Sequence, residues 1–339
     1  MSGNDIGAMA RTWAKSILKR REASLVVLLL VFLVPVLVRS PKFLAWDNLA
    51  LIFNDMSILT IVAIGQFFVI LSNGIDLSVG SIIAFSGMAA GMVNEAHPGL
   101  AIPLLLLISL GIGLLMGAFN GVLVAWGKIP PIITTLGTMS VYRGLTFVLS
   151  GGTWVTAHEM SASYIGFPRA QFLGISQLVW VAILVIAVMY YFITYTRTGR
   201  AFYAVGGNPV AARFAGVNEA RTRFIVFAMS GLLAGLAGGL WTARYASAVN
   251  EMASGFELQT VAACVLGGVS FSGGAGGVPG VVLGALFLTM LNNALPVIYL
   301  STFWQTFVEG LVILAALVIN TVVDQRKTAR LLAQRRVSK

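Results

Sequence analysis

Long apolar runs alternate with short polar segments along almost the whole chain. An α-helix that crosses the hydrocarbon core of a bilayer needs about 20 predominantly apolar residues, and ten runs approach that length. They cover residues 22–40, 50–72, 79–95, 100–126, 131–150, 173–195, 222–243, 257–270, 278–298 and 303–323. The pattern predicts an all-α polytopic membrane protein with about ten transmembrane helices.

Two of the ten runs, 79–95 and 257–270, are short for full crossings. Non-helical backbone at membrane depth is tolerated where the protein buries it, and broken helices of this kind occur in transporters. We therefore expect either run to be broken or partly re-entrant. The first run lacks a small-residue cleavage site and leads into further apolar runs, which favours a retained span over a signal peptide.

The most conspicuous polar interruption is TRTGRAFYAVGGNPVAARFAGV, residues 196–217. Asn208 is a good helix N-cap, and Pro209 suits the first helical position because its missing N–H costs nothing there. Gly216 is placed to end the helix in the left-handed conformation. The segment predicts a helix of about two turns, Pro209–Ala215, which is too short to be stable alone in water.

Val210, Ala211 and Phe214 form a small apolar face on this predicted helix. A short helix with such a face is suited to docking into a shallow groove of another protein, and we expect the small side chain of Ala212 to belong to the docking surface. From the residues alone, a solvated loop with a capped turn is an equally good interpretation.

The composition places the protein in a membrane: 58% of the residues are hydrophobic, 10% are charged, and the mean hydropathy is +0.90. Ten spans leave no room for a separate catalytic or nucleotide-binding domain. The lone Cys264 excludes a disulfide framework, and His97 and His158 have no metal-ligand spacing. With no nucleophile elbow, HExxH motif or paired carboxylates, we expect neither an enzyme nor a metal site.

The formal net charge of +10 reports orientation and not nucleic-acid binding. If both ends of ten spans are cytoplasmic, 17 of the 22 Lys and Arg residues lie inside. This bias predicts cytoplasmic termini and places the polar segment in the cytoplasm. We divide the chain into a basic N-terminal segment (1–23), a transmembrane body with a cytoplasmic loop at 196–221 (24–323) and a basic tail (324–339).

The stretch NGIDLSVG, residues 73–80, introduces a carboxylate into an apolar region. An ionisable group at membrane depth is costly and is by default a functional candidate. Asp76 has two interpretations: it caps the helix that begins near Leu77, which we favour, or it contacts a substrate directly.

The stretch KIPPIITTLGT, residues 128–138, opens a span with two prolines and then places three threonines on adjoining faces, Thr134, Thr135 and Thr138. Threonine hydroxyls in a span often bond to carbonyls of their own helix. The alternative is that they line a polar path for a hydroxyl-rich solute, which must exchange water for protein partners.

A late glycine-rich stretch, GGVSFSGGAGGVPG (267–280), lacks the lysine and hydroxyl pair of a P-loop. It precedes Asn292 and Asn293, which either hold helices together or face the pathway. Glycines also recur every four residues at Gly113, Gly117 and Gly121, and at Gly231, Gly235 and Gly239, a spacing that favours close helix packing.

Three motifs in this order, NGIDLSVG, the 196–217 segment and the 267–293 stretch with its Asn pair, resemble the permease subunits of ribose-type (ribose, galactose and arabinose) monosaccharide ABC importers. The resemblance implies a multi-pass protein of the bacterial inner membrane that works by alternating access. It implies a cytoplasmic ATPase partner, which binds ATP and Mg, so that this chain needs no cofactor. Further implied partners are a periplasmic or lipid-anchored sugar-binding protein and a second permease, either an identical copy or a paralogue.

The resemblance also assigns the candidate residues to two sites. Those for coupling to the ATPase are Arg200, Gly207, Asn208, Pro209, Ala211, Ala212, Arg213, Phe214 and Gly216. Those for the translocation path or its gate are Asn73, Asp76, Ser78, Thr134, Thr135, Thr138, Asn292 and Asn293. The alternative class is an ion-coupled secondary transporter of a small polar solute, which needs membrane-embedded charges to couple ions.

Overall fold

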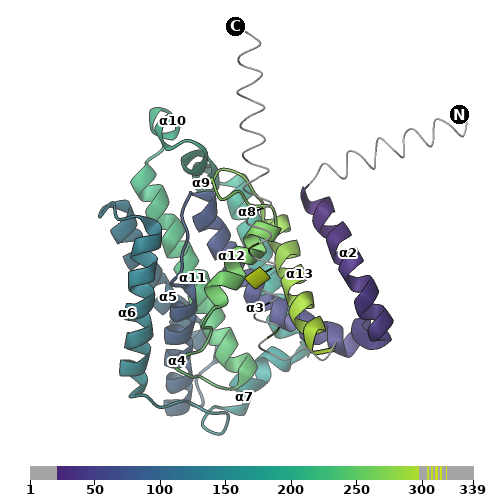
Figure 1. Ribbon diagram of the computed structural model, residues 1–339. Helices are drawn as coiled ribbons and strands as arrows, with labels where there is room; N and C mark the ends of the chain where they lie inside the picture. Colours follow the sequence, from purple (N-terminus) through teal and green to yellow (C-terminus); the bar gives the residue numbers. More distant parts are fainter. Residues whose placement is uncertain are drawn as a thin grey trace, which may run out of the picture.

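The computed structural model describes residues 21–297, together with six helical residues of the predicted tenth span, Trp304, Phe307, Gly310, Leu311, Leu314 and Val318. Residues 1–20 of the predicted N-terminal segment 1–23, the predicted tail 324–339 and most of 303–323 lie outside the described residues. α10 projects from one end of the helical bundle, and α7 lies at the opposite end (Figure 1).

The helices follow the order of the apolar runs. They are α2 (Arg21–Arg39), η1 (Pro41–Leu44), α3 (Trp46–Leu71), α4 (Val79–Ala96), α5 (Ile102–Ala125), α6 (Pro131–Ser150), α7 (Ala162–Gly166), η2 (Phe167–Arg169), α8 (Gln177–Tyr195), α9 (Arg197–Gly207), α10 (Pro209–Phe214), α11 (Glu219–Tyr245), α12 (Phe256–Leu266) and α13 (Val278–Val297). A two-stranded antiparallel hairpin, β1 (Gln171–Phe172) and β2 (Ile175–Ser176), precedes α8.

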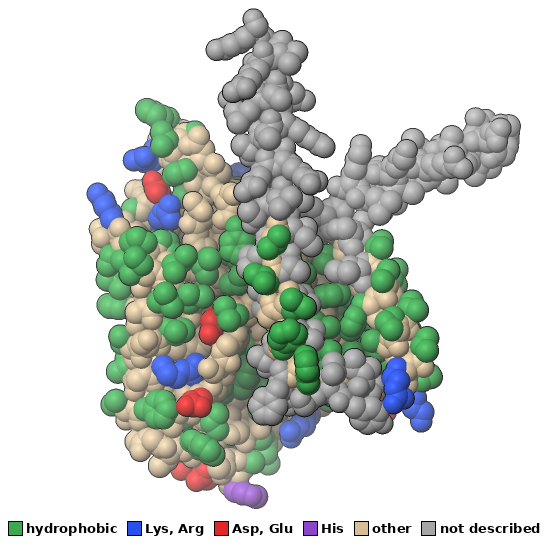
Figure 2. Space-filling view, in the orientation of Figure 1, with side chains coloured by type: hydrophobic (Ala, Val, Ile, Leu, Met, Phe, Trp, Pro, Cys, Tyr) green, Lys and Arg blue, Asp and Glu red, His purple; other side chains and the backbone are tan. Residues whose placement is uncertain are grey.

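The core of the bundle forms around α11, which packs against α3, α4 and α5. α3 and α11 are mostly buried, whereas α5, α6 and α8 expose many large apolar side chains. Apolar side chains cover much of the flank, and basic and acidic ones cluster at the end where α10 and the start of α11 lie, with others in the middle of this face and at the opposite end (Figure 2). A water-soluble protein does not expose apolar area on this scale, so the flank is the surface that faces lipid.

The predicted glycine stripes of α5 and α11 face each other. A Cβ atom on Gly117 would come 2.7 Å from the Cα of Gly231, and one on Gly235 would come 2.8 Å from the Cα of Gly113. Only glycine permits two backbones to approach this closely. The prediction that these glycines serve close helix packing is confirmed.

Six described helices, α3, α5, α6, α8, α11 and α13, are long and apolar enough to cross a membrane. α12 has 11 residues, and at 1.5 Å per residue it reaches only about half of a ~30 Å hydrocarbon core. The expectation of a short eighth segment is therefore confirmed. The total of about ten spans and the cytoplasmic location of both termini stay predictions.

α4, the predicted third segment, begins inside the bundle. Residues 72–78 are not helical, yet Asp76 and Ser78 are fully buried and Asp76 contacts Ser230, near the middle of α11. A second non-helical stretch, between α11 and α12, lies against the first turn of α4, because a Cβ on Gly80 would meet the carbonyl oxygen of Ala253 at 2.6 Å. These two non-helical stretches, residues 72–78 and 246–255, thus meet in the interior, where protein and not lipid surrounds their backbone.

Candidate functional site

The polar segment 196–217 contains two helices and not one. α9 begins after Thr196, whose hydroxyl accepts a hydrogen bond from the Gly199 amide at 3.0 Å. Phe202 and Val205 are buried on its inner face. The sequence analysis missed α9; the signals that could have found it are the Thr196 cap and the three-residue spacing of these two apolar residues.

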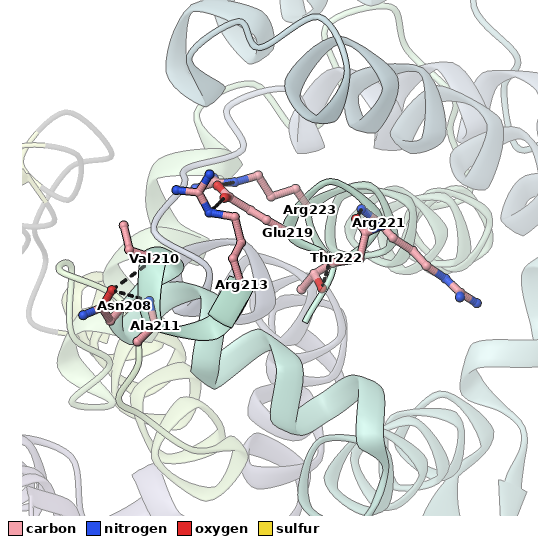
Figure 3. A network of polar contacts seen from close by, with 9 residues as sticks. Asn208, Val210, Ala211, Arg213, Glu219, Arg221, Thr222 and Arg223 are labelled. Carbon is pink, nitrogen blue, oxygen red and sulfur yellow. Dashed lines mark hydrogen bonds and ion pairs between the residues drawn. The ribbon is translucent and has the colours of Figure 1, made fainter. Parts of the chain in front are cut away.

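α10 is held at both ends as the sequence predicted. The Asn208 side-chain oxygen accepts from the amides of Val210 and Ala211, at 3.1 and 3.0 Å (Figure 3). Gly216 has φ +82°, and its amide donates to the Arg213 carbonyl while that of Val217 donates to the Ala212 carbonyl. These two bonds form a Schellman motif. The helix begins at Pro209 as predicted and ends one residue earlier, at Phe214.

The outward face of α10 is apolar. Phe214 is 91% exposed, Val210 is 51% exposed, and Ala211 is also exposed. Ala212 is only 4% exposed, so the expectation that it belongs to the docking surface is wrong. Its small side chain lies on the inner side of the helix, where a larger group would displace α10 from the protein itself.

A charged network joins α10 to α11 (Figure 3). The Arg223 guanidinium donates to one oxygen of Glu219 at 3.0 Å, and the Arg213 Nε lies 3.7 Å from the other. Arg223 is largely buried, whereas Arg213 is 61% exposed. Arg200, on α9, is exposed and donates to the Tyr195 carbonyl at 3.3 Å. Arg213 and Glu219 thus connect the short helix to the start of the central helix.

The projecting unit α9–α10 also touches the interior through its backbone. A Cβ on Gly206 would collide with the Leu71 carbonyl oxygen, and that same oxygen accepts from the Gly274 amide at 2.9 Å. Gly207 lies beside Gly274. The end of α3, the base of α10 and the glycine-rich 267–280 stretch therefore meet at one point.

Asp76 lies in a closed polar cluster within the non-helical stretch 72–78. One carboxylate oxygen accepts from the Ser78 amide at 3.0 Å and the Ser78 hydroxyl at 2.6 Å, and the other accepts from the Ser230 hydroxyl at 2.9 Å. The Gln66 amide, in the orientation that pairs donors with acceptors, bonds to both backbone groups of Asp76.

The cluster extends across the bundle. Asn120 of α5 donates to the Ser78 hydroxyl at 2.8 Å, and the Tyr142 hydroxyl of α6 lies 3.2 Å from the Asn120 side-chain oxygen. With Gln66 on α3 and Ser230 on α11, this chain of bonds ties four helices to the start of α4. Of the two interpretations of Asp76 the structural one is supported, although its partner is the N-cap residue Ser78 and not an amide of the first turn.

The threonines of α6 are buried and line no described cavity. Thr135 donates to the Pro131 carbonyl at 3.0 Å and lies 3.2 Å from the Ile75 carbonyl, and Thr138 lies 3.4 Å from the Thr135 carbonyl. Backbone bonding therefore accounts for both hydroxyls, while Thr134 is buried with no bonded partner. Asn73 is an exposed turn residue with φ +62° at the end of α3.

Asn292 and Asn293 lie elsewhere, in a cavity of 410 Å³ towards the opposite end of the bundle. Asp55 of α3 and Glu251 of the non-helical stretch 246–255 line the same cavity. The structure thus separates the eight predicted path residues into the closed cluster with its neighbours and this open cavity. Within the described residues, no three His, Cys, Asp or Glu side chains lie together as metal ligands.

Comparison with known proteins decides the family. Residues 48–317 match the family model described as "Branched-chain amino acid transport system / permease component". The chain belongs to this permease family. The match spans the interior cluster, α9–α10 and the Asn cavity, so all three lie within the permease domain.

Curated relatives of this permease extend over most of its length. It is 38% identical over 301 residues to the autoinducer 2 import system permease protein LsrC of Escherichia coli O157:H7, with 89% of this chain and 86% of the relative covered. It is 38% identical over 306 residues to the LsrC protein of Enterobacter sp. (strain 638), with 90% and 88% covered. No solved structure matches the chain.

These matches confirm the resemblance drawn from the three motifs at the level of the family. The permease is a multi-pass protein of the inner membrane and a subunit of an ABC importer for a sugar-type substrate.

Proposed function

We propose that this permease imports a neutral monosaccharide or a related small polyol, driven by a separate cytoplasmic ATPase that docks on α10. ATP and Mg bind to that ATPase, a periplasmic or lipid-anchored protein delivers the solute, and a second permease, identical or paralogous, completes the membrane unit. Ten spans with both termini in the cytoplasm complete the proposed topology. The observation that carries the proposal is an apolar Phe214 side chain, 91% exposed on a helix with both ends capped.

The mechanical basis of the proposal is the junction beneath α10. Because Gly206 lies against the Leu71 carbonyl and Leu71 is bonded to Gly274, a displacement of α9–α10 is transmitted to the end of α3 and to the 267–280 stretch. Close-packed interiors have low compressibility and transmit strain. Closure of an ATPase dimer therefore shifts the inner ends of the spans, as alternating access requires.

The alternative, an ion-coupled secondary transporter, gains little support from the described residues. Asp76 is enclosed by hydroxyl and amide donors, and Asp55 pairs with Arg244 at 3.3 Å. A coupling ion needs a membrane-embedded relay of such groups, and these two carboxylates are in separate clusters. The relatives are also named as permease proteins of an import system.

Phe214→Glu tests the docking proposal. We expect this substitution to leave the amount of permease in the membrane unchanged and to reduce co-purification of the cognate ATPase at least about tenfold, since burying an unpaired charge costs several kcal/mol. Uptake should fall in parallel. Phe172→Glu is the matched control, because Phe172 is 60% exposed in the hairpin before α8. Normal ATPase recovery with Phe214→Glu contradicts the proposal.

The proposed topology has an independent test. The protein has one cysteine, Cys264, which is fully buried, so an introduced thiol reacts against a low background. Ala215→Cys is expected to react with a membrane-impermeant maleimide in inside-out vesicles and not in intact cells. Labelling from outside intact cells would place α10 on the wrong side for an ATPase.

A further inference from the structure

The cavity that holds Asn292 and Asn293 combines amide, carboxylate and aromatic groups. It measures 410 Å³ and lies between α3, α11, α12, α13 and the non-helical stretch 246–255. Its polar lining includes Asp55, Glu251, Gln259, Thr289, Asn292 and Asn293. Such a lining is unusual at membrane depth, because each polar group there must find a partner in the protein or in a ligand.

One of these groups has no partner within the described structure. The Asn292 side-chain oxygen is buried and accepts no hydrogen bond. Its neighbour Asn293 donates to the Thr289 carbonyl at 3.0 Å. A buried acceptor left unpaired costs about 1–3 kcal/mol, so a side-chain rotation that turns this oxygen towards a hydrogen-bond donor on a ligand recovers that cost.

The aromatic wall of the cavity is fixed by ring contacts. Trp241 packs edge-on against Phe256, with centroids 5.0 Å apart and planes at 89°, and its ring centroid lies 5.1 Å from that of Tyr245. All three rings line the cavity. Broad apolar surface beside a few placed polar groups is the usual composition of a small-molecule site, and it matches a sugar ring with its C–H faces and peripheral hydroxyls.

The charges of the lining select against anions. Asp55 and Glu251 present carboxylates, whereas no Lys, Arg or His belongs to the lining as described. Arg244, which pairs with Asp55 at 3.3 Å, approaches it from outside the cavity. A carboxylate or phosphate on the solute would meet negative charge with no cation to pair with it, while hydroxyl groups would meet acceptors.

We propose that this cavity binds the solute in transit and accepts neutral polyhydroxylated molecules while excluding amino acids and sugar phosphates. The inference rests on the proposed function and goes beyond it by giving the solute a location in this chain and a basis for selection. The proposal also separates two kinds of solute, because the description of the family model names branched-chain amino acids, whereas the names of the relatives refer to autoinducer 2.

Protection of an introduced thiol tests occupancy directly. Ser254→Cys places a thiol on the exposed rim of the cavity, while Ser163→Cys, on α7, serves as an exposed control outside it. In membranes that contain the assembled importer, saturating D-ribose, D-galactose or D-glucitol is tested against N-ethylmaleimide. We expect at least one of them to slow alkylation of Ser254→Cys about fivefold, as for about 80% occupancy, and none to protect Ser163→Cys.

L-leucine and ribose 5-phosphate are the matched competitors, and neither is expected to protect. Protection by L-leucine or ribose 5-phosphate overturns the proposed selectivity. Absence of protection by all three polyols, in membranes that still take up at least one of them, overturns the site and leaves the proposed function intact. Membranes that take up none of them, with the complex assembled, contradict the proposed function itself.

Uptake kinetics supply a second measurement that does not depend on a thiol. Asn292→Leu keeps the branched shape of the side chain but removes the acceptor, and we expect it to raise the apparent KM for the imported polyol about tenfold at unchanged expression. Ser109→Ala is the control, because Ser109 is a buried hydroxyl outside the cavity that bonds to its own helix at 3.0 Å. Equal KM values for the two variants contradict the assignment.

Discussion

The capped helix α10 and the closed cluster at Asp76 use the same chemistry in opposite surroundings. In each, a side-chain oxygen accepts backbone amides at the start of a helix: Asn208 binds the amides of Val210 and Ala211, and Asp76 binds that of Ser78. Asn208 is exposed, while Asp76 is completely buried and also receives two hydroxyl hydrogen bonds.

The difference shows which element contributes to stability and which to coupling. Both carboxylate oxygens of Asp76 accept hydrogen bonds within the chain and the side chain is fully buried, so the cluster fixes the start of α4 and exposes no surface to a ligand. α10 leaves Phe214 uncovered, so its cap preserves the shape of a surface that only another molecule can complete. Substitutions in the first region should lower stability, and those in the second should lower transport.

The largest effect is expected from Asp76→Leu. It leaves the Ser78 and Ser230 hydroxyls without their acceptor in a buried site, and we expect a loss of about 3 kcal/mol of unfolding free energy. Thermal unfolding of the detergent-solubilised permease and its yield in membranes measure the effect.

Asp76→Asn is the matched control, because an amide oxygen still accepts from the Ser78 amide. We expect it to retain part of the transport activity and most of the yield. Complete loss of uptake by a correctly assembled Asp76→Asn complex would assign the carboxylate a role in transport that depends on its charge, and the contrast drawn above would fail.

Gly206→Val tests the backbone junction between the two regions. Because a Cβ there collides with the Leu71 carbonyl, α9 must move away from α3, which we expect to cost about 2 kcal/mol and to separate ATP hydrolysis from uptake. ATPase activity and uptake are measured in the same proteoliposomes. Gly207→Ala, where the nearest atom is 3.9 Å from the added Cβ, should remain coupled; uncoupling by both variants equally would contradict this role of Gly206.

Asn208→Ala removes the cap of α10 and should have an intermediate effect. Loss of an N-cap costs about 1 kcal/mol, which frays the docking helix without unfolding the bundle. We expect weaker ATPase association, unchanged thermal stability of the permease and recovery of association in Asn208→Asp. A lowered unfolding temperature for Asn208→Ala would instead give the exposed helix the role that we assign to Asp76.

The smallest effect is expected from Arg213→Gln. Its ion pair with Glu219 is 3.7 Å long and Arg213 is 61% exposed, so solvent and salt screen it, and about 0.3 kcal/mol is expected. Arg223→Gln is the comparison, because this arginine is largely buried and 3.0 Å from the same carboxylate. If unfolding shows equal losses for both, the exposed pair is stronger than its geometry suggests.

The sequence was sufficient for local features and insufficient for distant contacts. Six of the predicted apolar runs, the glycine spacing of α5 and α11, and both caps of α10 depend on neighbours in the chain, and the structure confirms them. Ala212 was misplaced because a six-residue helix has no reliable periodicity, and only its packing shows which side is inward.

Contacts between residues far apart in the chain could not be predicted from the sequence, because they depend on how the helices pack. Ser230 donates to Asp76 across 154 residues of sequence, and the local sequence around either residue does not predict this contact. The Asn cavity likewise gathers Asp55, Glu251 and Asn292 from distant segments. The threonines of α6 fit a polar lining in sequence, but the hydroxyls of Thr135 and Thr138 bond to backbone carbonyls of their own helix instead.

Where the end of α9 meets α3, Gly206 lies directly against the Leu71 carbonyl, and Phe202 packs against Phe68 nearby. The backbone part of this contact has no room for a side chain at position 206, so few sequences can form it. A change of cargo is therefore expected to come from the side chains that line the cavity at Asn292 and Asn293, because exchanges there leave the contact between α9 and α3 intact.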